Sequence, residues 1–446
     1  MEEFFIKAGQ LILMLSILVV LHELGHFIPA KLFKTKVEKF YLFFDPWFSI
    51  FKKKIGETTY GIGWLPLGGY VKIAGMIDES MDKDQMKQPP KPWEFRSKPA
   101  WQRLIIMLGG ITVNVILAWI IYTIMFATNG QQYISVEKAQ EQGLVFSELG
   151  KEMGFQDGDK IVSVDGKSQD QFKRLILDIM LSEEIVVERN GEKVIIHPTD
   201  EHIKEILSTI GKDNLMFPKT NGIIVDSLLN GTAKNAGVQV GDKILSINDE
   251  QFSASQLQEI LSRHKNDTIL LGIERNGKIE RIESLVSDSA KLGIGLAPNI
   301  KEEDLLVKKE YNVFSAFPVA VKESFTVLAY NIKNLKLIIR PKTEAYKQVA
   351  GPIGIARKLP STWDWGFFWN FTAMFSMWLA FVNLLPIPGL DGGHALFTLS
   401  EMITGRKLND KSMEIVQTIG MIILLSLMAL IFGKDIFDWI QDKFIK

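Results

Sequence analysis

Hydrophobic residues gather in four long stretches that polar sequence separates. The first lies between Lys7 and Lys31, and the others run from about Leu104 to Phe126, Gly366 to Leu385 and Ile415 to Phe432. Each has about the 20 residues that a helix needs to cross the hydrocarbon core of a bilayer, which is roughly 30 Å thick. The pattern therefore predicts a multi-pass α-helical membrane protein with four transmembrane helices.

The first stretch is predicted to stay in the protein as a transmembrane helix. Its start carries Glu2 and Glu3, no small-residue cleavage site follows it, and His22, Glu23 and His26 come directly after its apolar run. A signal peptide, the alternative, has a basic start and a small-residue cleavage site.

A fifth segment, Val313–Arg340, has apolar residues spaced three or four apart, as in an amphipathic helix. Lys322, Glu323, Lys333 and Lys336 interrupt it and argue against a fifth span. We expect this helix to lie on the membrane or on the other spans. A role in gating and plain packing both stay open.

The second span carries small and polar residues within an otherwise apolar helix. Gly109 and Gly110 let another backbone approach closely, and Asn114 can hydrogen-bond between helices. Close helix packing is the expected role, and plain core packing stays open as the alternative.

Between the second and third spans the sequence repeats itself with an offset of 83 residues, since Gly154–Asp165 (GFQDGDKIVSVD) matches Gly237–Asn248 (GVQVGDKILSIN). In each copy a Gly-Asp turn leads into an alternating strand, and a helical stretch, a strand, an Arg-Asn-Gly turn and another strand follow. This pattern resembles the PDZ domain, which binds extended peptides or C-terminal carboxylates by strand addition. A duplicated β-rich spacer is the alternative, and whether either copy keeps an open groove stays open.

The composition reveals a division that the totals hide. The 446 residues include 51 Lys+Arg, 52 Asp+Glu, 10 Trp and no Cys. Residues 131–300 carry 19 basic and 27 acidic residues and no Trp, a net charge of −8 against +7 for the remainder. Because Trp favours membrane interfaces, we expect soluble modules inserted between membrane segments. The charge gives no support for nucleic-acid binding, and any zinc site must use His and carboxylate ligands.

Basic residues near the span ends predict the orientation. The loop between the first two spans carries Lys31, Lys34, Lys36, Lys39, Lys91, Arg96, Lys98 and Arg103. The positive-inside rule places this loop in the cytosol. The third span then returns to the cytosolic side, where Arg406, Lys407 and Lys411 follow. The acidic middle and both termini are expected on the opposite side.

The segment His22–His26 (HELGH) is an H-E-x-x-H motif that continues the first apolar helix. Positions i and i+4 of a helix put both imidazoles on one face, where they can share a Zn²⁺ with Glu23 beside it. Two surface histidines with an incidental Glu are the alternative. Ionisable residues within a span are costly, however, and indicate a function.

A catalytic zinc site usually has three protein ligands. At the cytosolic end of the third span lies Asn383–His394 (NLLPIPGLDGGH), where two prolines end the helix and Asp391 is the only carboxylate. The predicted topology brings this break to the same membrane face as His22 and His26, so Asp391 is the expected third ligand. His394 is a competing ligand but is expected to support the site or to pack.

These two motifs resemble the site-2 protease family of intramembrane zinc metalloproteases, whose patterns are HExxH and N-x-x-P-x-P-x-x-D-G. The four spans and the two PDZ-like repeats between the second and third resemble the bacterial regulator-of-sigma-E protease subgroup. Gly351–Ile355 (GPIGI) and Trp64–Lys72 (WLPLGGYVK) are also similar to that subgroup. The resemblance covers essentially the whole chain.

The resemblance implies a role for each matched residue. It implies one Zn²⁺ held by His22, His26 and Asp391, with Glu23 as general base. It also implies that Asn383 contacts substrate near the scissile bond, and satisfying the backbone of the broken helix is the alternative role of Asn383.

Gly61, Gly63 and Pro388 are further candidate substrate contacts. The glycine-rich region 56–76 is expected to form a membrane-associated hairpin or pair of strands with an open edge. Cleavage requires extended backbone, so we expect this edge to hold unwound substrate.

The chain is therefore expected to have five parts. These are an N-terminal membrane part (1–130), two PDZ-like α+β domains (131–215 and 216–300), an amphipathic helix with its connector (301–362) and a C-terminal membrane part (363–446).

The leading hypothesis is a monomeric zinc endopeptidase of the bacterial inner membrane. It would cleave single-span membrane proteins after a first protease, as in anti-sigma-factor or signal-peptide-remnant processing. The PDZ-like domains and both termini would lie in the periplasm, with the active site near the cytosol. A catalytically inactive scaffold with peptide-binding modules is the alternative, against which Glu23 argues. A zinc transporter would need polar residues along several spans.

Overall fold

A computed structural model describes residues 2–66, 68–76, 88–209, 215–219, 222–229, 231–252, 257–298, 305–406 and 410–444. Leu67 and Lys407, used above, lie outside the described residues. The chain forms two compact units. The first comprises Met1–Gly130, Glu310–Leu335 and Val349–Lys446, and the second comprises Gln131–Lys309 and Lys336–Gln348. The second unit contains the acidic, Trp-free middle of the sequence.

The first unit is built on long helices. They are α1 (Glu2–Leu32), α3 (Ala100–Asn129), α11 (Val313–Ile338), α13 (Trp365–Leu384) and α15 (Asp410–Phe444), joined by the shorter α12 (Pro352–Lys358), α14 (Asp391–Thr404) and η1 (Phe95–Ser97). α3 starts after Pro99 and is followed by Gly130, whose positive φ of 67° suits glycine and whose amide bonds to the Phe126 carbonyl oxygen. The Asp364 carboxylate accepts a hydrogen bond from the Phe367 amide at the start of α13, and α13 ends just before Pro386.

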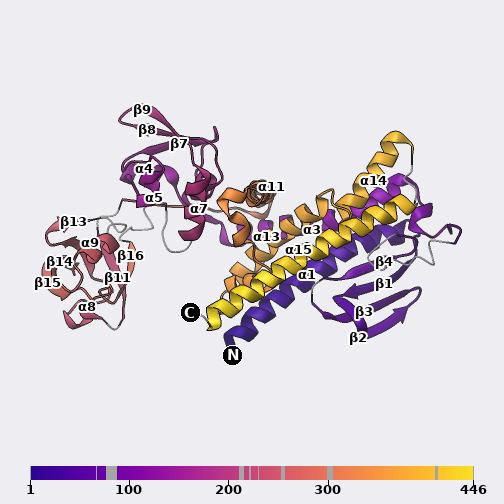
Figure 1. Ribbon diagram of the computed structural model, residues 1–446, viewed down its shortest axis with the longest axis horizontal. Coiled ribbons are helices and arrows are strands. Elements are labelled where there is room, and N and C mark those ends of the chain that lie inside the picture. Colours follow the sequence, from indigo (N-terminus) through magenta and orange to yellow (C-terminus); the bar gives the residue numbers. More distant parts are fainter. Residues whose placement is uncertain are drawn as a thin grey trace. The chain divides into compact units, whose positions relative to one another are not determined.

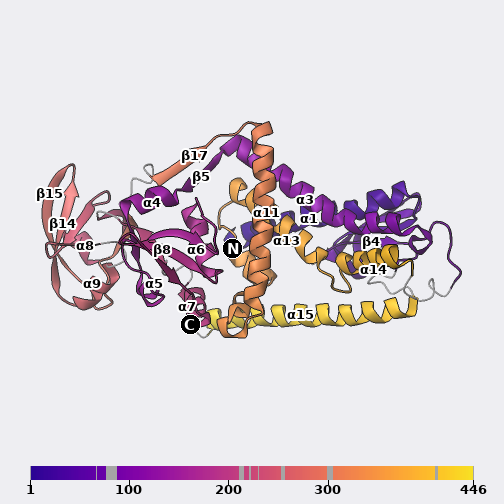
Figure 2. The ribbon, with the colours of Figure 1, turned by 90° about the horizontal axis from the view of Figure 1, so that it is seen from above.

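Five helices among the described residues are long and apolar enough to cross a membrane, namely α1, α3, α11, α13 and α15. The sequence predicted four of them, and α11 is the additional candidate. α11 runs across the direction of α1, α3, α13 and α15 (Figures 1 and 2). An amphipathic helix that lies along the membrane would have this orientation. Four crossings therefore stay our prediction.

A sheet of four strands packs beside α1. Its strands are β1 (Val37–Leu42), β2 (Phe44–Ile55), β3 (Thr58–Leu65) and β4 (Tyr70–Ile73), in the order β2-β3-β1-β4. β1 runs parallel to β3, and the other neighbours are antiparallel. The sequence predicted strands only in region 56–76. It missed β1, whose residues read as a basic loop, and β2, whose apolar alternation a bulge interrupts.

The expected open edge is not at Gly61. β3 is an interior strand, and Gly61 is opposite Tyr41 of β1 on one side and Lys52 of β2 on the other. A methyl group on Gly63 would collide with the backbone carbonyl of Phe44. These glycines let neighbouring groups pack onto β3, and the edge strands of the sheet are β2 and β4.

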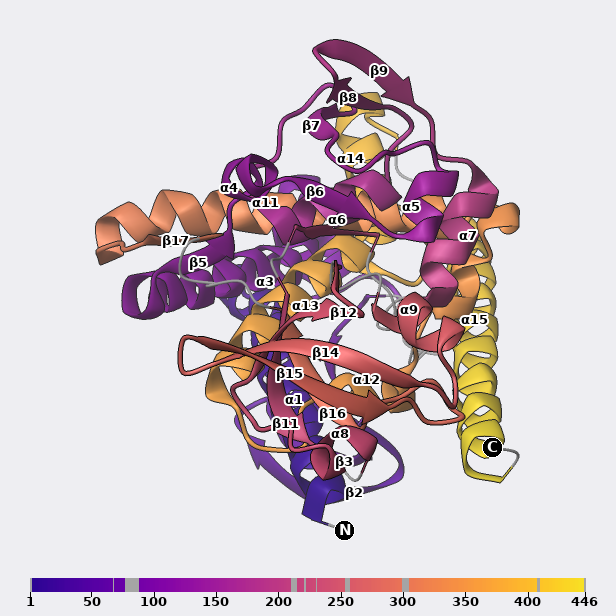
Figure 3. The same ribbon diagram turned by 90° about the vertical axis from the view of Figure 1, so that its left-hand side faces the viewer.

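The second unit contains both repeats (Figure 3). The first repeat forms β6 (Leu144–Phe146), α5 (Glu148–Glu152), β7 (Lys160–Val164), α6 (Phe172–Met180), β8 (Ile185–Arg189), β9 (Glu192–Ile196), α7 (Asp200–Thr209) and β10 (Met216–Pro218). The second forms β11 (Ile223–Leu228), α8 (Thr232–Asn235), β12 (Lys243–Ile247), β13 (Glu250–Gln251), α9 (Leu257–Arg263), β14 (Thr268–Arg275), β15 (Lys278–Leu285) and β16 (Ile294–Pro298). The remaining elements are β5 (Gln131–Ile134), α4 (Val136–Gln142), β17 (Leu306–Lys309), η3 (Pro341–Thr343) and η4 (Ala345–Gln348). Each repeat encloses its own apolar core.

The two repeats share the predicted order of strand, helix, strand, turn and strand. The first has the sheets β7-β8-β9 and β6-β10, and the second has a sheet in the order β15-β14-β12-β11-β16, with β13 paired to β12. β16 is therefore an edge strand of the second repeat.

The same ion pair occurs in both repeats, between the Asp of the Gly-Asp turn and the Arg of the Arg-Asn-Gly turn. Arg189 Nη2 lies 2.8 Å from Asp159 Oδ2, and Arg275 Nη2 lies 2.6 Å from Asp242 Oδ2. Both aspartates are buried. Burial opposes ionisation of Asp242, but hydrogen bonds from Arg275 and the Gln239 amide outweigh it and lower the pKa of Asp242. Each ion pair joins the start of one strand (β7 or β12) to the end of the strand that pairs with it (β8 or β14).

We expect the second repeat to lose stability in acid. The folded pKa of Asp242 lies below the unfolded value of about 3.9, so its ionised carboxylate stabilises the repeat above that pH. This stabilisation disappears as the pH falls through the folded pKa. The protection of the β12 and β14 amides in the full chain, measured relative to the intrinsic exchange rate at each pH, should therefore fall in acid. Asp242→Asn should be destabilised at neutral pH but less sensitive to acid. Asp226→Asn, at an exposed position, is the control. An acid response that survived in Asp242→Asn would contradict this prediction.

A buried carboxylate connects α15 to the GPIGI segment. Asp435 accepts hydrogen bonds of 3.0 Å from the amides of Gly351, Ile353 and Gly354 at the start of α12. A methyl group on Gly351 or Gly354 would press against the Asp435 carboxylate. The glycines of this motif therefore allow the first turn of α12 to dock on α15.

Candidate metal centre

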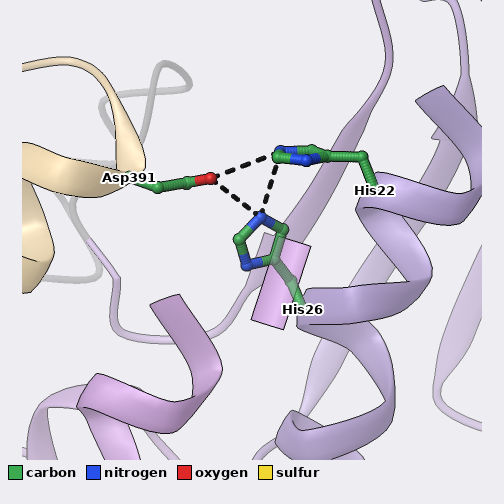
Figure 4. A group of neighbouring side chains, drawn as sticks. All are labelled: His22, His26 and Asp391. Carbon is green, nitrogen blue, oxygen red and sulfur yellow. Dashed lines mark hydrogen bonds and ion pairs between the residues drawn. The ribbon is translucent and has the colours of Figure 1, made fainter. Parts of the chain in front are cut away.

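The two histidines of HELGH lie one turn apart on α1 and point to the same side (Figure 4). His22 Nε2 and His26 Nε2 are 3.3 Å apart. They lie 3.3 Å and 3.2 Å, respectively, from Asp391 Oδ2. The structure therefore brings together the three residues that the sequence proposed as ligands.

This cluster fits a tetrahedral zinc ion. Ligand atoms about 2.0–2.1 Å from Zn²⁺ lie about 3.3 Å apart at the corners of a tetrahedron, which matches the observed triangle. Asp391 Oδ2 is buried and has no hydrogen-bond partner among the described residues, as expected of an oxygen that serves a metal. Two imidazoles and a carboxylate leave the fourth corner for substrate or water.

Close contact between α1 and α3 positions the histidines. A methyl group on Gly25 would collide with Gly109 and Gly110, and one on Gly109 would collide with the carbonyl oxygen of Gly25. A methyl group on Gly110 would collide with the rings of His22 and His26. The predicted close packing of the second span is therefore confirmed, and it occurs at the metal centre.

Asp391 is the first residue of α14, where the helix dipole favours a carboxylate. The chain between α13 and α14 folds so tightly that a methyl group on Gly392 would collide with Leu384 and Leu385 carbonyl oxygens. α14 is held to α3 by Arg103, whose Nη2 lies 2.6 Å from Glu401 Oε1. Arg103, counted above as a topology signal, therefore supports the element that carries Asp391.

Glu23 lies between the two histidines, and its carboxyl group interacts electrostatically with His22, His26 and Asp391. The backbone of Val71, in edge strand β4, hydrogen-bonds to this carboxyl group. The only edge strand that reaches Glu23 in the described sheet is thus β4, which lies within the region 56–76 where the sequence predicted an open edge.

The remaining candidates are placed as follows. Asn383 lies in the last turn of α13 and is half-buried, and its side chain makes no hydrogen bond to the described residues. Pro388 packs against Gly420 of α15. His394 is buried and contacts the side chain of Gln417 through Nε2, so it does not join the ligand triangle. Gly61 and Gly63 line the interior strand β3.

Two buried histidines and a carboxylate that could hold a metal, an acid beside them and helices long enough to cross a membrane are the features of a membrane metalloprotease. The chain belongs to peptidase family M50, the site-2 proteases, whose model matches residues 10–427. It is 29% identical to a Vibrio cholerae protein that is named provisionally as a zinc metalloprotease, over 95% of this chain and 97% of that protein.

Two further relatives are also named as proteases. The regulator of sigma E protease of Haemophilus influenzae is 24% identical over 97% of this chain and 99% of its own length. A Clostridium acetobutylicum protein, also named provisionally as a zinc metalloprotease, is 28% identical over 95% of this chain and 96% of its own length. The chain is therefore a zinc metalloprotease.

Proposed function

We propose that this metalloprotease cuts transmembrane segments of single-span membrane proteins, using a Zn²⁺ held by His22, His26 and Asp391. The observation that carries the proposal is the triangle of ligand atoms. Two of its residues lie on α1, a helix that can span a membrane, and Asp391 begins α14, just after α13 ends. Glu23 at this triangle distinguishes a protease from an inactive scaffold, because holding a metal needs no acid between the ligands.

The chemistry divides between the metal and the protein. Bound zinc supplies a Lewis acid that polarises the scissile carbonyl and acidifies water. The Glu23 carboxylate accepts a proton from the attacking water and returns it to the leaving amine. The half-buried Asn383 carboxamide, which lacks a partner among the described residues, donates a hydrogen bond to substrate backbone.

Strand β4 is proposed to hold the unwound substrate. A helical segment hides its amides in its own hydrogen bonds, so cleavage needs an extended backbone and a partner for it. β4 pairs with β1 on one side, and on its other side the backbone of Val71 meets Glu23. Substrate added at this edge would lie beside the general base.

The proposal also covers the membrane in which the protein lies, its orientation there and the role of the two repeats. We place the second unit and both termini in the periplasm of a bacterial inner membrane, and the metal centre near the cytosol, on the charge pattern above. The start of α1 and the end of α15 lie at the same end of the helix bundle (Figure 1), which supports an even number of crossings. The two repeats are proposed as PDZ-like modules that admit substrates already trimmed by another protease, as in anti-sigma-factor or signal-peptide-remnant processing.

Removing the metal should abolish cleavage reversibly. Reconstituted protein with a single-span substrate should contain one zinc per chain, lose cleavage with a chelator and regain it when zinc is added, because the ion would supply the Lewis acid of the reaction. His22→Ala should bind no zinc and stay inactive after zinc addition. Metal content and product mass spectrometry measure both results. A chelator-treated enzyme that still cut the substrate would exclude the proposed mechanism.

Val71→Pro should weaken cleavage of a helical transmembrane substrate. Proline removes the amide that faces Glu23 and spoils the edge on which substrate would pair. Ile50→Pro in the other edge strand is the control, because Ile50 lies at a bulge with no residue opposite it. Initial cleavage rates should fall only for Val71→Pro, with zinc content unchanged in both variants. Equal rates for wild type and Val71→Pro would sink the substrate role of β4.

A further inference from the structure

Both histidines contact α3 through the ring nitrogen that faces away from the other ligands. Each directs Nε2 at Asp391 Oδ2, so each Nδ1 lies on the opposite side of its ring. His26 Nδ1 is 2.8 Å from the backbone carbonyl oxygen of Ile106, and His22 Nδ1 is 3.0 Å from the carboxamide of Asn114. α3 therefore touches both imidazoles at the positions that decide their tautomers.

The chemistry of a metal-binding imidazole fixes what Asn114 must offer. A neutral imidazole that presents Nε2 to a metal carries its hydrogen on Nδ1, and this hydrogen needs an acceptor. The Ile106 carbonyl accepts it from His26. Asn114 is fully buried, and its Oδ1 has no hydrogen-bond partner among the described residues. Rotating the carboxamide by half a turn exchanges its nitrogen and oxygen, which places this acceptor opposite His22 Nδ1.

We propose that Asn114 is a positioning residue whose Oδ1 accepts the Nδ1–H of His22 and holds the ring with Nε2 towards the zinc. This inference rests on the zinc site of the proposed function. A second contact fixes Asn114 itself, because Ser376 Oγ of α13 donates a 2.7 Å hydrogen bond to the backbone oxygen of Asn114. The helix whose end carries Asn383 is thereby connected through α3 to a zinc ligand.

Zinc affinity of the full-length protein, measured by competition with a chromogenic chelator, tests this role. Asn114→Leu fills the volume but offers no acceptor, so zinc should bind about 10- to 100-fold more weakly. Asn114→Asp keeps an acceptor and should bind zinc at least as tightly as wild type. Thr123→Ala is the matched control, because Thr123 is also buried on α3 but hydrogen-bonds only its own helix, at the Trp119 carbonyl.

The order of the two variants separates positioning from packing. If Asn114 only filled space, Asn114→Leu would be tolerated and Asn114→Asp would be the harmful change. Tighter zinc binding by Asn114→Leu than by Asn114→Asp therefore overturns the proposal. If Asn114→Leu does not fold, Asn114→Asp decides alone, and weaker zinc binding than wild type overturns the proposal. Wild type that binds no zinc, or His22→Ala that binds it normally, would instead refute the metal site of the proposed function.

Discussion

Glu23→Gln is expected to retain one zinc per chain and to lose cleavage by about 10² to 10⁴-fold, the usual contribution of a general base. Gln has the size of Glu and keeps a hydrogen-bond acceptor for the Val71 backbone, but it cannot take a proton from water. The three ligand atoms come from His22, His26 and Asp391, so the metal should stay bound. Initial rates on a reconstituted single-span substrate and metal content of the same samples measure both effects.

The control is an equally conservative change at an acid elsewhere in the same unit. Glu38→Gln alters a carboxylate of β1 that faces Lys36 and Lys72 and lies outside the ligand cluster. It should cleave like wild type. Equal cleavage by Glu23→Gln and wild type would remove Glu23 from the mechanism, whereas loss of zinc together with cleavage would assign it a structural role.

Gly110→Ala is expected to lower zinc affinity by about 10- to 100-fold, the range found when support for metal ligands is lost. Alanine is better than glycine within a helix by about 0.8–1.0 kcal/mol, so the backbone of α3 itself should gain from the change. The new methyl group would nevertheless collide with both imidazoles. Any loss of zinc affinity must therefore come from displacement of the two imidazoles.

Gly433→Ala in α15 is the matched control, because a methyl group there meets no atom within 4 Å. It should leave zinc affinity unchanged and the protein as stable as wild type or slightly more so. Chelator competition and thermal unfolding on both variants measure the comparison. Gly110→Ala with wild-type zinc affinity would show that the imidazoles can move aside, contrary to the packing described here.

The residues that form the metal triangle could be predicted because their signals are local or follow from topology. The helical spacing of HELGH predicts that His22 and His26 share one face, and the topology predicts that Asp391 lies at the same membrane face because two prolines end a span there. The family resemblance then assigned their roles, and the family match and relatives confirm the class of enzyme but not the individual residues.

Contacts between distant segments could not be predicted in the same way. Asn114 is 92 residues from His22, and no spacing rule connects a side chain in one span to the ring of another. Helix packing was the expected role of Asn114, and its contact with His22 became visible only with both helices in place. Likewise, the position of Gly61 inside the sheet depends on β1, whose residues read as a basic loop, and on β2, whose apolar alternation a bulge interrupts.

The contact of Gly110 with both imidazoles has a consequence for inhibitors. Since α3 fills the space behind His22 and His26, we expect a compound that binds the zinc to approach from the side of β4, where the Val71 backbone meets Glu23. A strand-like inhibitor with a zinc-binding group at its centre would match this approach, because its backbone could pair with Val71 while its amides reach Asn383. Helical peptides of the same sequence should bind poorly, since their backbone offers the edge of β4 no partner.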